Sequence, residues 1–162
     1  MATVFSVCSL LMAFLFAVSA SFQLNDPDWY FWFPLYTCGC IVNLANGLCR
    51  FPKTPTLAKL TLWLGVCLFI KVAVEGLAIG GVSVLWSIDM RERVVREKNG
   101  SGLVTASMYV HLMKQLSRHH QPTRHEAEPA TLIQNGMLLT LVTVGYGVSV
   151  LFYLRHHQEM RF

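Results

Sequence analysis

Charged residues are scarce in this chain. Asp, Glu, Lys and Arg together make up 14% of its 162 residues, against about 25% in a typical soluble domain. The scarcity excludes an intrinsically disordered chain, because such chains are rich in charge and poor in apolar residues. It also excludes a soluble globular domain, because 54% of the residues are hydrophobic and a core of this size cannot enclose so many apolar side chains. The class that fits is an integral membrane protein.

Several familiar functional motifs are missing as well. The sequence holds no P-loop, dinucleotide fingerprint, nucleophile elbow or metalloprotease helix, so we expect no cofactor and favour a non-enzymatic protein. The five cysteines include no C-x-x-C pair, the spacing typical of redox and zinc sites. The 13 Lys and Arg residues are spread over short loops, so no basic stripe for nucleic acid is present. They are typical instead of topology signals and lipid-headgroup contacts.

Long uncharged or nearly uncharged runs dominate the chain. A helix needs about 20 apolar residues to cross the hydrocarbon layer, and a backbone in lipid must form its hydrogen bonds internally, as helices do. We therefore predict an all-α, multi-pass transmembrane bundle in a single membrane domain. The fourth predicted span is short and contains His111 and Lys114. The predicted spans are 4–22, 29–48, 60–81, 102–116 and 130–154.

The segments between these spans carry the remaining predictions of topology. Residues 82–101 are predicted as a helical extension or loop, and residues 117–129 as a polar loop. The run Val18-Ser19-Ala20 is also typical of a signal-peptidase site, but no Lys or Arg precedes the apolar run, which favours a retained first span. The positive-inside count is tied, and the early basic linker 49–59 favours a cytoplasmic N-terminus.

Two short motifs resemble a known family. The turn after the first span reads QLNDPD at 23–28 and leads into an aromatic-rich span with Tyr36, and RE at 96–97 is followed by SGLV at 101–104. With the order of the spans, this pattern is similar to the transmembrane protein 220 family over nearly the whole chain. Residues 98–100 read as an insertion, and the run before them mixes Arg and Glu where the family pattern is more acidic. The resemblance implies a small multi-pass membrane protein and carries no biochemical activity with it.

The acidic turn is the first candidate site. In any alternating topology, the loops after the first and third spans lie on the same membrane face. Their polar residues can therefore form one surface site for a cation, a lipid headgroup or a polar substrate. The alternative is a purely structural helix cap, with Asp26 as N-cap, Pro27 as first helical residue and Asp28 near the positive end of the dipole. The candidate residues are Asn25, Asp26, Asp28, Glu92, Arg96 and Glu97.

Lys71 and Glu75 are the second candidate, because each lone charge in a span costs about 2.5–3.5 kcal/mol on the insertion scale. Four residues apart on a helix, they can neutralise each other. Either they face the other helices as a structural pair, or they line a transport or proton pathway.

The third candidate lies in the loop between the last two spans. His119, His120 and His125 could bind zinc or copper weakly. Their spacing matches no closed four-ligand site, so a solvated loop is favoured and no metal is expected.

These observations rank three functions. The leading one is a non-enzymatic protein that binds or organises lipid or a protein partner, with a polar site at one membrane face. The alternatives are a small membrane enzyme or lipid-modifying protein that uses the acidic turn, and a transporter or channel subunit that uses Lys71 and Glu75. The expected partners are membrane lipids and either another protein or a second copy of this chain, with no nucleic acid.

Overall fold

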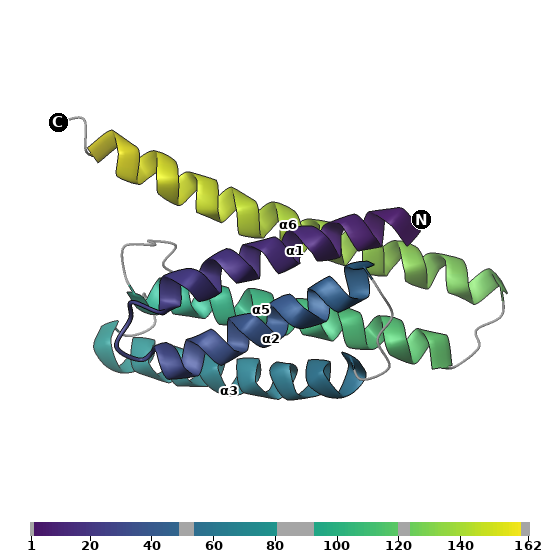
Figure 1. Cartoon of the computed structure of the whole chain (residues 1–162), viewed down its shortest axis with the longest axis horizontal. Helices are drawn as coiled ribbons and strands as arrows, with labels where there is room; N and C mark the ends of the chain where they lie inside the picture. The colour runs from purple at the N-terminus through teal and green to yellow at the C-terminus, as the bar shows by residue number, and fades with distance from the viewer. Residues whose placement is uncertain (1, 49–53, 81–92, 120–123, 160–162) are drawn as a thin grey trace.

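The computed structural model describes residues 2–48, 54–80, 93–119 and 124–159, and within these ranges it contains helices and no strand (Figure 1). By length and hydropathy, three helices could each cross a membrane, which confirms the predicted all-α, multi-pass class. The stretches that qualify are Val4–Gln23, Pro55–Ala78 and Pro129–Leu151. The helices are α1 (Ala2–Gln23), α2 (Trp29–Leu48), α3 (Thr54–Gly80), α5 (Arg93–His119) and α6 (Arg124–Glu159).

The two remaining helices each lie along one of these candidate spans. α2 packs beside α1, and α5 packs beside α3, as Figure 1 shows. The Trp, Tyr and Asn residues of α2 and the charged start of α5 lower their mean hydropathy. Side-by-side packing therefore supplies the apolar contacts that hold α2 and α5 in the bundle.

The helices extend past several of the segments predicted from hydropathy. α3 begins at Thr54, before the predicted span 60–81, and α5 begins at Arg93. Residues 93–101, predicted as an extension or loop, therefore belong to the same helix as the predicted fourth span. Of the predicted polar loop 117–129, residues 117–119 and 124–129 are helical, and 120–123 lie outside the described residues. Residues 82–92 of the predicted extension also lie outside them. Hydropathy marks where a helix meets the apolar layer, but backbone hydrogen bonding continues into polar sequence.

The core lies where α1, α2, α3 and α5 meet, and α6 adds Leu138 and Val142 to it. Its largest fully buried side chains recur at helical spacing, so each helix presents one face inward. Phe16 of α1 illustrates this, because its ring lies against Gly39 of α2. The centroids of the Phe16 and Tyr36 rings are 6.4 Å apart, and the two rings are tilted relative to each other. The largest of these buried residues include Met12, Phe16, Trp32, Leu35, Val72, Val104 and Met108.

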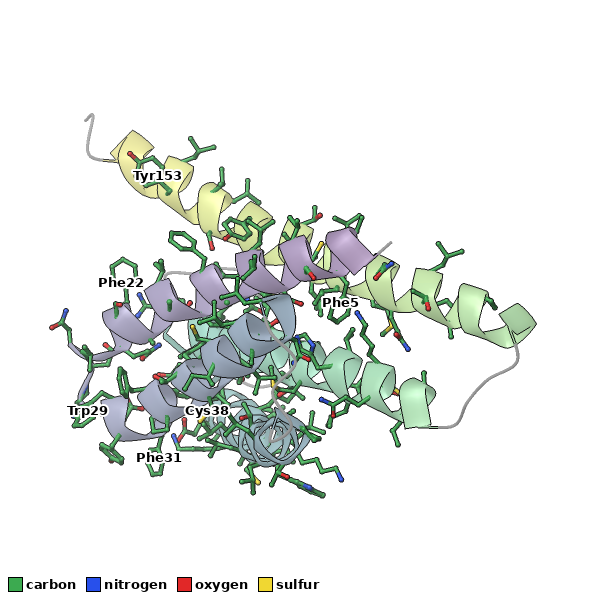
Figure 2. All side chains as sticks on the ribbon, turned by 45° about the vertical axis from the view of Figure 1, so that its right-hand side comes forward. Phe5, Phe22, Trp29, Phe31, Cys38 and Tyr153 are labelled. Atoms are coloured by element: carbon green, nitrogen blue, oxygen red, sulfur yellow. The ribbon has the colours of Figure 1, made fainter. Side chains whose placement is uncertain are left out.

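α6 is the helix least embedded in the bundle. Its middle contacts α1 through the Tyr146 hydroxyl, which donates to the Leu11 carbonyl at 2.9 Å. Its first half contacts α5, where Gln134 Nε2 donates to Ser117 Oγ at 3.1 Å. Beyond these contacts the C-terminal part, shown in yellow, extends away from the other helices and carries the exposed Tyr153 (Figures 1 and 2).

Candidate functional site

The acidic turn between α1 and α2 is held by its own backbone. Asp26 N–H donates to the Gln23 carbonyl at 3.0 Å, and Trp29 N–H donates to the Asp26 carbonyl at 3.2 Å. α2 begins at Trp29, so Asp28 is the residue that precedes the helix. The predicted cap is therefore displaced by two residues from Asp26. The Asp28 Oδ2 atom accepts a hydrogen bond from Trp32 Nε1 at 3.1 Å, which orients one carboxylate oxygen toward the helix.

The start of α5 lies at the same end of the bundle as this turn (Figure 1). Here the two charged residues of the RE motif differ, because Arg96 is exposed whereas Glu97 is only 5% exposed. The Tyr36 hydroxyl lies where a Cβ on Gly100 would stand. The absence of a side chain at Gly100 therefore lets α2 and α5 approach each other closely beside Glu97.

The structure thus brings the acidic turn and the RE motif to one end of the bundle. Asn25 is exposed, and Asp26 and Asp28 are half-buried. Glu92 lies outside the described residues. The combined surface site stays a prediction. Asp28 bonds to Trp32 of the helix that it precedes, and Glu97 is buried one turn before Gly100, where α5 meets α2.

A second polar cluster, absent from the sequence predictions, lies inside the bundle. The buried amide network consists of Asn43 from α2 and Ser107 and His111 from α5. Asn43 Nδ2 donates to the Gly39 carbonyl at 2.9 Å and to Ser107 Oγ at 3.0 Å. Ser107 Oγ lies 3.1 Å from Asn43 Oδ1, and His111 Nε2 lies 2.8 Å from the same oxygen. The Phe5 ring of α1 meets His111 edge-on, and Lys114 Nζ lies 2.9 Å from the centroid of that ring.

The geometry of this network argues against catalysis. A carbonyl can only accept, so Gly39 requires the nitrogen of the Asn43 amide on its side, which turns Oδ1 toward His111. His111 Nε2 must then carry the proton, and Ser107 donates to the same oxygen. His111 and Ser107 are therefore not paired as base and nucleophile. The network instead joins α2 to α5. Asn43 and His111 were visible in the sequence as polar residues within apolar runs, but their pairing was not.

Lys71 and Glu75 form the predicted ion pair on α3, with 2.9 Å between Nζ and Oε1. Their side chains are 39% and 44% exposed. The pair therefore lies at the surface of α3, and the other described helices do not enclose it. For the predicted histidine cluster, the side chains of His119, His120 and His125 lie outside the described residues. Within the described part of the chain, no three potential metal ligands come together.

Packed apolar helices, three of them long and apolar enough to span a membrane, define a helical, multi-pass integral membrane protein. Residues 15–113 match the sequence model of the family described as "Transmembrane family 220, helix". The match covers more than half of the chain, from the middle of α1 through most of α5, so the chain belongs to this family. It includes both the acidic turn and the buried amide network. No solved structure matches the chain.

Proposed function

We propose that this protein is a non-enzymatic membrane protein that binds the cationic headgroup of a zwitterionic lipid at the acidic turn. The observation that carries the proposal is the pairing of carboxylates with exposed aromatic rings at one end of the bundle. Trp29, Tyr30 and Phe31 directly follow Asp28 and are 45%, 55% and 42% exposed. Figure 2 shows Trp29 and Phe31 at this end of α2. We call Asp26, Asp28, Trp29, Tyr30 and Phe31 the hairpin surface.

The chemistry of the hairpin surface matches an ammonium group. Carboxylates attract a cation, and aromatic faces bind quaternary or primary ammonium groups through cation–π contact. Tyr30 and Phe31 lie with their ring centroids 4.5 Å apart, and Trp29 meets Phe33 edge-on at 6.3 Å. Trp and Tyr also prefer the headgroup level of a bilayer. A choline or ethanolamine headgroup carries such a cation at that depth.

The structure offers the transport alternative no comparable support. A pathway through the chain requires its charged groups to face the interior or a water-filled cavity. Lys71 and Glu75 are instead half-exposed on the outer side of α3. The Lys71–Glu75 pair therefore gives the transport alternative no support, and the hairpin surface remains the proposed site.

The test is native mass spectrometry of the full chain in mild detergent with defined lipids. The probes are phosphatidylcholine, phosphatidylethanolamine and phosphatidylglycerol, the last of which lacks an ammonium group. We expect phosphatidylcholine and phosphatidylethanolamine to bind to the wild type. In Asp26→Asn/Asp28→Asn their affinity should fall about tenfold, which corresponds to about 1.4 kcal/mol of binding free energy. The amide oxygen that replaces the Asp28 carboxylate can still accept from Trp32, so the turn is retained.

Two tryptophan variants distinguish lipid binding at the hairpin surface from non-specific contact between lipid and the rest of the protein. Trp29→Ala should weaken phosphatidylcholine binding about threefold, in line with roughly 0.5–1 kcal/mol for an exposed cation–π contact. Trp63→Ala removes an exposed tryptophan of α3, 69% exposed and away from the hairpin surface, and should leave binding unchanged. Equal adducts on all variants, or a preference for phosphatidylglycerol, would show that the hairpin surface is a structural cap.

A further inference from the structure

The Lys71–Glu75 pair lies in an unusual place. It belongs to the candidate span Pro55–Ala78, yet both side chains are more than a third exposed. Charged residues within membrane spans almost always face a bundle interior or a water-filled cavity, because a lone charge in lipid is costly. The described helices of this chain leave the pair on the outside. Its position calls for a covering surface that the described residues do not supply.

The residues around the pair are apolar and point outward with it. Cys67, Ile70 and Val74 are exposed, and their helical spacing places them beside Lys71 on one side of α3. We call Cys67, Ile70, Lys71, Val74 and Glu75 the outer face of α3. Lipid chains can pack against its apolar members. They cannot accept from the three N–H groups of a lysine or donate to a carboxylate.

We infer that a second copy of this chain covers the outer face of α3 in a two-fold symmetric dimer. Charge complementarity between the two copies supports this dimer. Two copies inserted in the same direction are related by an axis along the membrane normal, so their α3 helices run parallel. Lys71 and Glu75 are one helical turn apart, about 6 Å along the axis, within reach of a lysine side chain. Lys71 of each copy therefore meets Glu75 of the other, and two lysines and two glutamates form a neutral ring.

This self-complementarity specifies a charge experiment. In a Lys71→Glu dimer four carboxylates would meet, and in a Glu75→Lys dimer four ammonium groups would meet. We expect each variant alone to lose self-association at least tenfold. An equal mixture of the two variants should recover it, because the opposite charges then pair between chains. The swapped Lys71→Glu/Glu75→Lys chain should associate like the wild type.

The measurement is energy transfer between donor- and acceptor-labelled full-length chains in phosphatidylcholine vesicles. Lys59→Glu is the matched control, because it makes the same change in net charge at an exposed position near the start of the same helix. It should not alter association. A monomeric wild type, a single variant that associates normally, or a mixture that fails to recover association would overturn the dimer.

A second readout leaves the charges untouched. The axis of a parallel dimer places Cys67 of both copies at the same depth, so a short bifunctional maleimide should cross-link wild-type chains in vesicles. Cys67→Ser should remove the product, whereas Cys38→Ser, a half-buried cysteine of α2, should not. Absence of the wild-type product, or its persistence in Cys67→Ser, would exclude the outer face of α3 as the contact.

Discussion

The buried amide network and the Lys71–Glu75 pair are polar clusters in neighbouring parts of one helical bundle, and they are placed differently. Asn43, Ser107 and His111 are buried between α2 and α5, and their mutual hydrogen bonds link the two helices. Lys71 and Glu75 bond within one turn of α3 and stay half-exposed. The first cluster stabilises the fold of one chain. The second places an ammonium and a carboxylate group at the surface, where the proposed partner copy would contact them.

The largest expected effect on stability comes from disrupting the buried amide network. Asn43→Leu removes the bonds to both Ser107 and His111, and each buried group left without a partner costs about 1–3 kcal/mol. We expect the free energy of unfolding to fall by about 2–3 kcal/mol, measured by tryptophan fluorescence during titration with a denaturing detergent.

Asn46→Leu is the control for this change, because the Asn46 amide bonds to the Val42 carbonyl of its own helix at 2.9 Å. Its effect should stay well under 1 kcal/mol, consistent with the roughly 0.6 kcal/mol average for hydrogen bonds in membrane proteins. Equal losses from the two variants would mean that the network does not join α2 to α5.

A smaller effect is expected where α2 and α5 approach each other. Gly100→Ala places a methyl group where the Tyr36 hydroxyl lies, and Tyr36 is buried, so its ring must shift. Overpacking of this kind costs about 1–3 kcal/mol. Tyr36→Phe in the Gly100→Ala chain should recover part of the loss, because the hydroxyl is the closest atom. The same detergent titration measures both.

Gly136 of α6 provides the comparison, since nothing lies within 4 Å of a Cβ built there. Gly136→Ala should be neutral or stabilising by up to about 1 kcal/mol, the difference in helix propensity. Destabilisation by Gly136→Ala of the same size as by Gly100→Ala would indicate that the effect is a general property of helical glycines.

The smallest effect on stability is expected for the Lys71–Glu75 pair in protein diluted until it is monomeric. Lys71→Met leaves the Glu75 carboxylate uncompensated and should lower the free energy of unfolding by about 1 kcal/mol, less than for a buried pair because both side chains are half-exposed. The Lys71→Met/Glu75→Met chain should regain wild-type stability, since no charge is then left unpaired. A double variant less stable than Lys71→Met would show that the pair itself stabilises the monomer.

Much of this architecture follows from the sequence alone. Scarce charge and long apolar runs indicate a multi-pass helical protein. In lipid the backbone must form its hydrogen bonds internally, and helices and closed barrels are the structures that do so. The i,i+4 spacing of Lys71 and Glu75 predicted their ion pair, since helix geometry places such residues together. The order of the segments likewise predicted that the acidic turn and the start of α5 share one end of the bundle.

Other features required the tertiary structure, because they depend on how the helices rotate about their axes and pack. The pairing of Asn43 with Ser107 and His111 joins residues more than sixty positions apart, and no local spacing encodes it. The same holds for Glu97, which is buried although the neighbouring Arg96 is exposed. The outward position of the Lys71–Glu75 pair was also decided by packing: local spacing brings the two charges together, but only the neighbouring helices determine which side of α3 they cover.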